Sequence, residues 1–402
     1  MIKLSTTHLR KVMDKMLRDQ FLLDPDIVFL NHGSFGACPR KVFEVYQAWQ
    51  RQLELQPVQF LGLELDNYLY QSRHKLGEYI HTSADNLVYI PNATHGVNIV
   101  ARSLHLQQGD EILTTNQEYG ACNFTWQFVC EKTGSVYKAQ TVTLPAKSPE
   151  HIVDQIWQGV TPHTKVIFIS HITSPTSLTL PIQLINQRAR HAGIFTMIDG
   201  AHAPGQIPLD LDSLQADFYI GNCHKWMLSP KGAGFIYARP DVQMLIEPLI
   251  VSWGYQSRYG PPRESRFIDF LQWSGTKDPS AALSVPSAIE FMNENDWNQV
   301  HFTCHNLLRD AMERIYAITG LPSLYPLDSE FYQQMATIPI PLVKDLSELK
   351  NRLYSDYKIE IPCIEWEYQH YLRLSVQGYN TIDDIDKLVV ALQVLLPTMK
   401  VA

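Results

Sequence analysis

The sequence is poor in cysteine, and the cysteines it has lie far apart. Six occur in 402 residues, and none forms a CxxC pair. Closely paired cysteines would mark a disulfide framework or a zinc site. Their absence predicts reduced thiols, no bound metal and a cytoplasmic protein. The six are Cys38, Cys122, Cys130, Cys223, Cys304 and Cys363.

Other features are missing as well. The net charge is −8 and both signs are mixed along the chain, without the basic run that nucleic-acid binding favours. No apolar stretch reaches the roughly 18 residues of a membrane helix. Residues 1–20 lack the apolar centre of a secretory signal. We therefore expect a protein that binds neither nucleic acid nor a membrane.

Hydrophobic residues make up 45% of the chain and charged residues 18%, which is typical of a globular protein. A chain of 402 residues can bury a large core, and we expect two lobes. Near the start, His8–Leu23 predicts a helix and Ile27–Leu30 a short strand. A glycine-containing turn over 31–36 follows, and then helices at about 40–56 and 66–81.

Apolar runs alternate with helical patterns through the middle of the chain, as in the helix predicted around Val97 and Leu104. This alternation predicts an α/β fold with a mostly parallel sheet covered by helices on both faces. The predicted strands are Leu87–Ile90, Glu111–Thr115, Val136–Leu144, Val166–Ile172, Phe195–Ile198, Phe218–Ile220 and Gly234–Ala238. Such a sheet binds its ligand at the carboxyl ends of its strands. That rule places Asn92, Tyr119, Ser174, Asp199 and Asn222 along one rim.

The pattern changes after about residue 280 to α+β, which predicts a smaller C-terminal lobe. We expect helices at about 280–293, 297–318 and 346–356, and a last helix from Ile382. Strands are expected at Met335–Ile340, Lys358–Ile361 and Tyr371–Val376. The predicted organisation is residues 1–25 as an N-terminal helix packing with the small lobe, 26–280 as the large lobe and 281–402 as the small one.

Lys225 and Asp199 carry the strongest chemical signal. Lys225 follows an apolar strand in Gly221-Asn222-Cys223-His224-Lys225-Trp226, and Asp199 ends the run Phe195–Ile198. A lysine amine can form a Schiff base with the aldehyde of pyridoxal 5'-phosphate (PLP), and a carboxylate can keep the pyridine nitrogen protonated. Burial would lower the lysine pKa and favour the nucleophilic amine. Taken singly, the lysine could be a surface charge and the aspartate a capping residue.

The cofactor phosphate needs hydrogen-bond donors, and a helix start can supply them. Thr94 can cap the helix that follows Pro91-Asn92-Ala93-Thr94, and the free N–H groups there can hold a phosphate. A simple cap explains the same residues equally well. Asn222 and His224, beside Lys225, could add further hydrogen bonds.

Three further residues fit a PLP site, each with a structural alternative. The Tyr119 ring could stack on the pyridine face, and His202 could bond the ring oxygen. Both could instead be structural. Arg373 lies inside an apolar alternating strand, where it needs an anionic partner. A substrate α-carboxylate gripped in bidentate fashion would serve, and so would a buried protein acid.

In this order, these residues resemble the class V (NifS-like) aminotransferase superfamily of fold-type I PLP enzymes, over about Phe29 to Asn380. Several motifs resemble its isopenicillin N epimerase-like branch. They are Asn31-His32-Gly33-Ser34-Phe35-Gly36, Ser170-His171-Ile172-Thr173-Ser174-Pro175-Thr176, Asp199-Gly200-Ala201-His202-Ala203-Pro204-Gly205, His224-Lys225-Trp226 with Pro230-Lys231-Gly232-Ala233-Gly234-Phe235, and Trp273-Ser274-Gly275-Thr276-Lys277-Asp278-Pro279-Ser280.

The resemblance implies a role for each matching residue. Lys225 would be the Schiff-base lysine, Asp199 the pyridinium partner and Arg373 the carboxylate-binding arginine. Cofactor contacts would come from Ala93, Thr94, Tyr119, Ser174, His202, Asn222 and His224. Gly275 and Thr276 match a loop that reaches the phosphate of a partner subunit, which implies a homodimer with shared sites. Asn31 and His32, with the loop at Trp253-Gly254-Tyr255, would line the substrate side.

Two departures count against cysteine desulfurase activity. Desulfurases carry a reactive cysteine on a glycine-rich loop well before the arginine, whereas the interval from Cys363 to Arg373 is short. Cys363 is expected to end a strand and to pack as a small apolar residue. Ser174 also stands where the desulfurases usually have asparagine.

The shared chemistry is removal of a substrate α-proton by the freed Lys225. Returning it to the opposite face gives an epimer, returning it to the cofactor gives transamination, and loss of a β-substituent gives a lyase. We expect an epimerase-like enzyme acting on an amino acid or peptide-like amino acid, with a C–S lyase or aminotransferase as alternatives. Tyr119, His32 or a substrate group could be the acid on the far face. A non-catalytic protein that kept the fold is the remaining alternative.

Overall fold

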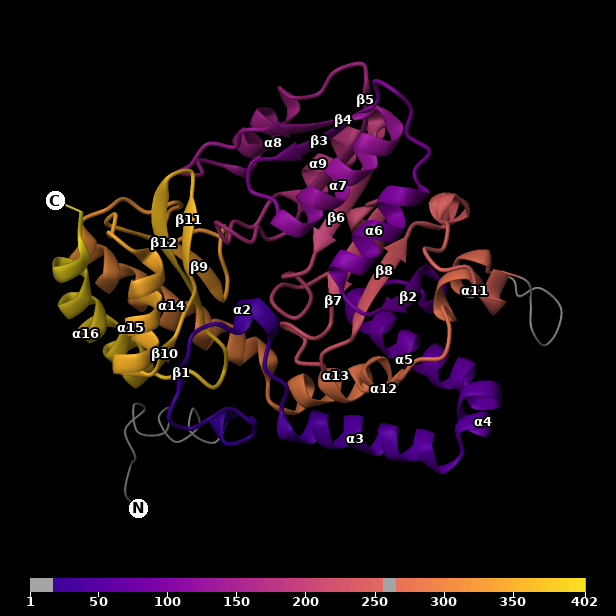
Figure 1. The fold of residues 1–402 in the computed structure, drawn as a ribbon, viewed down its shortest axis with the longest axis horizontal. Helices are drawn as coiled ribbons and strands as arrows, with labels where there is room; N and C mark the ends of the chain where they lie inside the picture. Colours follow the sequence, from indigo (N-terminus) through magenta and orange to yellow (C-terminus); the bar gives the residue numbers. More distant parts are fainter. Residues whose placement is uncertain (1–16, 256–264, 402) are drawn as a thin grey trace.

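The computed structural model describes residues 17–255 and 265–401. Its centre is a seven-stranded sheet in the order β2-β8-β7-β6-β5-β3-β4 (Figure 1). All neighbours pair in parallel except β8, which runs antiparallel to both β2 and β7. The strands are β2 Leu87–Ile90, β3 Glu111–Thr115, β4 Val136–Gln140, β5 Thr164–Ser170, β6 Phe195–Gly200, β7 Phe218–Asn222 and β8 Gly234–Ala238.

Alternating side chains of the strands feed two separate cores, one on each face of the sheet. On β5, Val166 and Phe168 pack into one core, whereas Ile167 and Ile169 pack into the other. This follows from the two-residue period of a strand. One face is covered by α6 (Ala93–Ser103), α7 (Gly120–Thr133) and α11 (Arg266–Gln272), and the other by α5 (Leu65–Ile80), α8 (Pro149–Trp157) and α9 (Ile182–His191). The predicted fold class is confirmed.

Two short segments differ from their prediction. The segment 31–36, predicted as a glycine-containing turn, contains the single-turn helix α2 (His32–Phe35), which is followed by Gly36 with a φ of +69°. The chain between the two long predicted helices, α3 (Arg40–Leu55) and α5, is helical as well, through α4 (Pro57–Gln59) and a π-helical turn at Phe60–Glu64. A proline at the first helical position explains the restart at Pro57.

The C-terminal part forms the predicted smaller α+β unit, which lies beside the large sheet in Figure 1. Its sheet has the order β11-β12-β9. The first strand of the chain, β1 (Val28–Phe29), pairs in parallel with β10 (Ile359–Glu360). The other elements are α12 Ser280–Leu283, α13 Val285–Glu294, α14 Trp297–Thr319, β9 Met335–Ile340, α15 Leu346–Tyr357, β11 Cys363–Trp366, β12 Gln369–Ser375 and α16 Ile382–Met399.

The expectation that Cys363 ends a strand is wrong. Cys363 begins β11, which pairs antiparallel with β12 and sets Cys363 opposite Leu372. Glu367 and Tyr368, with φ values of +49° and +60°, form the tight connection between the two strands. Pro362 separates this hairpin from β10, and the interval before Arg373 is short because it is a hairpin.

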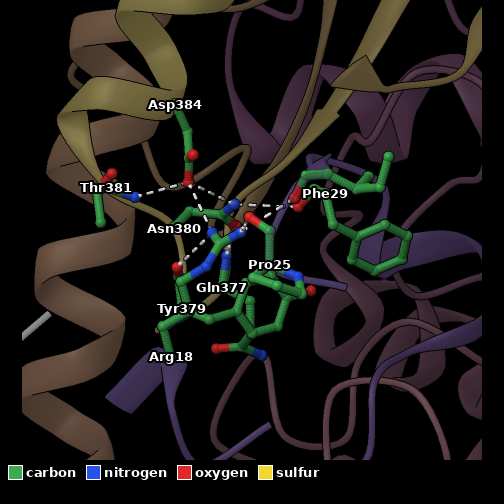
Figure 2. Close-up of polar contacts among 9 residues, drawn as sticks. Arg18, Pro25, Phe29, Gln377, Tyr379, Asn380, Thr381 and Asp384 are labelled. Atoms are coloured by element: carbon green, nitrogen blue, oxygen red, sulfur yellow. Dashed lines mark hydrogen bonds and ion pairs between the residues drawn. The ribbon is translucent and has the colours of Figure 1, made fainter. Parts of the chain in front are cut away.

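The predicted opening helix His8–Leu23 lies largely outside the described residues, but Arg18 shows how the N-terminal segment meets the small unit. Its guanidinium donates to the carbonyls of Ile27 at 3.0 Å and Tyr379 at 3.5 Å, and it approaches Asp384 at 3.5 Å. Figure 2 shows Arg18 directed toward Tyr379 and Asp384, at the start of α16. Asp384 also accepts from the backbone N–H of Thr381 at 3.0 Å, closing a capping box.

Replacing Asp384 should destabilise the protein measurably. The buried carboxylate accepts hydrogen bonds from Thr381, Asn380 and Arg18. We expect Asp384→Ala to lower the free energy of unfolding by about 2–3 kcal/mol, because it leaves these donors without their acceptor. Urea unfolding measures the change. Lys387→Ala, at an exposed position on the same helix, is the matched control, and equal stability of the two variants would contradict the assignment.

Candidate active site

A cavity of about 510 Å³ opens at the carboxyl ends of the parallel strands. It brings together nine of the predicted site residues, which come from loops far apart in the sequence. They are Ala93, Thr94, Tyr119, Ser174, Asp199, His202, Asn222, His224 and Lys225. Ser34, Phe35, Ser170, Ala201 and Lys231 also line it. The strand-end rule therefore located the cavity correctly.

Lys225 follows β7 and reaches His202, whose Nε2 lies 3.1 Å from the lysine Nζ. Burial lowers the pKa of Lys225 to about 8, with a smaller contribution in the same direction from the positive charge of Arg373. The negative charge of Asp199 opposes the shift. About a tenth of Lys225 is consequently a neutral amine at pH 7, far more than for an ordinary lysine, and this is the nucleophilic and basic form.

Asp199 ends β6 and is 4% exposed. One carboxylate oxygen accepts from the backbone N–H of Ala201 at 2.9 Å, and the other accepts from the Cys122 thiol at 3.5 Å. Burial raises the Asp199 pKa, while the Ala201 hydrogen bond and the charge of Lys225 lower it. A buried carboxylate held by an amide and a thiol is suited to a cationic ligand, which the protonated pyridine nitrogen would supply.

The N-terminus of α6 supplies the phosphate side of the cavity. Thr94 is not the cap of this helix, because Asn92 caps it by accepting from the backbone N–H of His95 at 2.9 Å. Asn222 accepts from the N–H of Ala93 at 2.8 Å and so fixes β7 to the helix start. Asparagine is at least as good a cap as threonine, and this arrangement leaves the Thr94 amide available for a phosphate oxygen.

His224 lies beside this helix start and is neutral. Its Nδ1 donates to the carbonyl of Ala233 at 3.0 Å, and burial lowers its pKa to about 4. The Nε2 atom can therefore donate to a phosphate oxygen only after it gains a proton, which a phosphate dianion would favour. Together with Lys225, Asp199 and the α6 terminus, this donor set fits PLP.

Arg373 lies on β12, is 8% exposed and has only neutral partners among the described residues. One terminal nitrogen donates to the carbonyl and hydroxyl of Ser174 at 3.0 and 2.9 Å, and the other donates to the Ser34 hydroxyl at 3.0 Å. Its Nε has no partner in that part of the chain. Burial lowers the pKa of Arg373 to about 10. Among the described residues, Arg373 does not form the buried ion pair with a protein acid that was the alternative to substrate binding.

Asn31 and His32 do not line the cavity. Asn31 accepts from Ser34 at 2.6 Å and donates to Glu360 at 2.9 Å, so it orients the serine that holds Arg373. His32 is fully buried behind the site, with Nε2 donating to the Lys225 carbonyl at 3.0 Å and Nδ1 2.9 Å from the Tyr379 hydroxyl. Burial lowers the His32 pKa to about 3. Direct substrate contact by either residue stays a prediction.

The remaining predicted residues differ in exposure. Tyr119 lines the cavity and is 48% exposed, so its ring can take part in ligand binding. Gly275 and Thr276 follow α11 and are not part of the cavity lining, and Thr276 is exposed. Their contact with a partner subunit stays a prediction.

Glu118 is a residue that the sequence analysis missed; it is outside the cavity lining but holds Ser170, which is part of it. Its buried carboxylate accepts from the backbone N–H and the hydroxyl of Ser170 at 2.8 and 2.6 Å, and from the Thr115 hydroxyl at 2.6 Å. Burial raises its pKa to about 7, with the negative charge of Asp199 adding to the shift. The only feature of the sequence that could have indicated Glu118 is its position beside Tyr119 at a strand end. Its partner Ser170 is distant in sequence, so their contact could not be predicted.

Glu118→Gln should remove a pH-dependent loss of stability. A glutamate whose folded-state pKa is about 7, above its ordinary value, destabilises the fold as pH rises through that range. We expect the wild type to lose about 3 kcal/mol relative to Glu118→Gln between pH 4.5 and 7.5. Urea unfolding of the cofactor-free proteins measures this difference. Parallel pH profiles of the two proteins would contradict the assignment.

The fold and this site define a PLP-dependent enzyme of fold-type I. A model of the family "Aminotransferase class-V" matches residues 38–388, and the chain belongs to this family. Pyridoxal 5'-phosphate is its cofactor. No described helix has the length and apolar character needed to cross a bilayer, and no described group of histidine, cysteine and acidic residues is arranged to hold a metal.

Two individual relatives and one solved structure show what this chain is most informatively compared with. The chain is 33% identical over 388 residues to isopenicillin N epimerase of Amycolatopsis lactamdurans, which covers 94% of this chain and 97% of the relative. It is 27% identical over 398 residues to a probable chloroplastic L-cysteine desulfhydrase of Arabidopsis thaliana, covering 91% and 82%. The solved apo cysteine desulfurase of Thermococcus onnurineus NA1 matches with a TM-score of 0.82 at 17% identity, covering 96% and 98%. This last likeness shows the fold alone.

Proposed function

We propose that this protein is a PLP-dependent epimerase-type enzyme that removes and returns the Cα proton of an amino acid or peptide-like amino acid. One observation carries the proposal: a single cavity is lined by a lysine with a depressed pKa and by a buried aspartate. Ser34 and Ser174 of the same lining hold Arg373, which is not itself in the lining and has only neutral partners among the described residues. The similarity to isopenicillin N epimerase supports the reaction type.

Each residue contributes a definite step. Bound PLP supplies an electron sink for the negative charge that develops at Cα. Arg373 binds the substrate carboxylate. Ser174 and Ser34 hold its guanidinium through neutral hydroxyl groups, so the positive charge of Arg373 stays available to the carboxylate. Lys225 takes the Cα proton on one face, and Asp199 keeps a positive charge at the pyridine nitrogen throughout.

Epimerisation also needs an acid on the opposite face of Cα. His32 is a poor candidate, because it is fully buried, neutral and bonded at both ring nitrogens. Tyr119 lines the cavity with its ring half exposed, and we propose that it, or a group of the substrate, returns the proton. We propose in addition that Asn31 acts on the substrate indirectly, through Ser34 and Arg373.

A C–S lyase is the second candidate, and the similarity to an L-cysteine desulfhydrase favours it. Loss of a β-substituent needs Lys225 as the base and no acid on the far face, so the same cavity serves. For an aminotransferase, Lys225 would return the proton to the cofactor and not to Cα. Desulfurase chemistry is not proposed, because Cys363 is outside the cavity lining and burial raises its pKa to about 12.

The experiment that separates these reactions is a substrate panel in heavy water. We expect deuterium to enter Cα of an accepted substrate together with inversion of its configuration, without other change. Pyruvate with a released thiol or sulfide would instead establish a lyase, and a keto acid would establish transamination. A PLP-loaded protein whose absorbance ignores every amino acid tried would favour the non-catalytic alternative.

The assembly is also a proposal. We propose a cytoplasmic homodimer in which Gly275 and Thr276 of one subunit approach the phosphate bound by the other. We propose further that the lobes divide near residue 280 and that the N-terminal segment packs with the small lobe through its described part, at Arg18. Analytical ultracentrifugation tests the dimer, and a monomer with full activity would overturn it.

A further inference from the structure

Trp226, the residue after Lys225, reaches the back of the His202 ring. Its indole Nε1 lies 3.4 Å from His202 Nδ1, and Trp226 is fully buried. The other nitrogen of the same imidazole, Nε2, lies 3.1 Å from the Lys225 amine. His202 thus stands between an indole that is fixed by packing and the amine that carries the chemistry.

The hydrogen-bonding capacity of the indole decides the tautomer of His202. An indole N–H can only donate, so His202 Nδ1 must accept, and the proton of the neutral imidazole must reside on Nε2. The opposite tautomer would set two N–H groups against each other in a buried site and leave both donors unsatisfied. The imidazolium form has the same fault, and burial lowers the pKa of His202 well below its ordinary value.

We propose that Trp226 is a positioning residue that holds His202 in the Nε2–H tautomer, so that His202 presents a hydrogen-bond donor to Lys225 and to the ring oxygen of PLP. This goes beyond the proposed function, because it holds whichever reaction follows proton removal.

Two consequences follow for the site. The ammonium form of Lys225 can only donate, so a donor at His202 Nε2 disfavours it and favours the neutral amine. A donor facing the cofactor's ring oxygen also stabilises negative charge on that oxygen. By fixing the tautomer of His202, Trp226 therefore affects both Lys225 and PLP, the two groups that form the covalent bond.

The packing around Trp226 keeps its indole in place. Its ring lies against His32, with ring centroids 4.8 Å apart. The loop that carries His202 contacts the backbone of Trp226 directly at Gly205, where a Cβ would come within 2.4 Å of the Trp226 carbonyl carbon. Gly205 has a φ of +83°, so glycine meets both the conformational and the steric need.

The test is Trp226→Phe, which keeps an aromatic ring and removes the N–H. The tautomer is read by ¹⁵N NMR of the cofactor-free protein labelled at histidine, with His202→Gln to assign the signal. We expect Nε2–H at His202 in the wild type and a shift to Nδ1–H in Trp226→Phe, because Nε2 can then accept from the Lys225 ammonium. A second readout is the attachment of PLP to Lys225 at pH 7, which should become slower, by about tenfold, because the lysine pKa rises and less of the amine is neutral.

Trp297→Phe is the matched control. Trp297 is buried on α14, and its indole N–H has no hydrogen-bond partner among the described residues. It should change neither readout. The proposal is overturned if His202 keeps its proton on Nε2 in Trp226→Phe. If Trp226→Phe does not fold, the wild-type spectrum provides the test. A proton on Nδ1 of His202 would overturn the proposal. A proton on Nε2, together with a Trp226 indole resonance that shifts in His202→Gln, would support it.

Discussion

Lys225→Ala should lose turnover by a factor of at least about 10³, because the same side chain serves as the cofactor anchor and as the general base. The structure gives the physical reason for its reactivity. Burial holds its pKa at about 8, and His202 faces its amine at 3.1 Å. Alanine removes the base but leaves Asp199 and the α6 terminus, so PLP should still bind without forming a covalent bond.

The measurement has two parts. Borohydride reduction followed by peptide mapping should label the wild type at Lys225 and leave the variant unlabelled, while single-turnover kinetics follow the Cα proton. Lys165→Ala, an exposed lysine on β5, is the control and should match the wild type in both. Label on any other lysine of the wild type would refute the role assigned to Lys225, and so would a variant that keeps the wild-type rate.

The main elements of the fold could be predicted because period and composition determine them. Strand runs such as Val166–Ile169 are apolar throughout, which indicates burial on both faces, and the predicted strand ends led to Asp199 and Asn222. The run Val136–Leu144 was predicted too long, since β4 ends at Gln140. The apolar residues after it, such as Val142, are buried in a loop, and a buried loop and a strand have the same composition.

Side-chain direction is what the sequence could not show. Ser34 and Phe35 of the motif 31–36 line the cavity, whereas the side chains of Asn31 and His32 do not line it and bond Glu360 and Tyr379. Glu118 was missed for a related reason. Its main partner, Ser170, lies on a strand that is adjacent only in the folded sheet. Hydrogen bonds between residues distant in sequence have no spacing from which they could be predicted.

Asp199→Asn should lower turnover by a factor of about 10²–10⁴ while leaving the fold and the cofactor's covalent bond intact. Asparagine keeps the size of aspartate, and its carbonyl oxygen can still accept from the Ala201 amide, so the loss isolates the charge. Removing one partner of a buried charge pair costs about 3–5 kcal/mol, which corresponds to that range of rates. Here the missing charge is the one that keeps the pyridine nitrogen protonated, and without it the ring absorbs the Cα electron pair poorly.

A purely structural role for Asp199 would lead to a different result. Its second oxygen accepts from the Cys122 thiol, so Cys122→Ala tests whether that contact matters, and we expect that variant to keep most of the wild-type rate. If Asp199→Asn and Cys122→Ala slowed turnover equally, local packing would explain both, and the charge assignment would fail. A large loss in Asp199→Asn alone, with unchanged unfolding in urea and unchanged borohydride labelling at Lys225, would place the effect on the cofactor ring. The Cα deuterium exchange rate measures that loss directly, because proton removal is the step that draws on the electron-accepting power of the ring.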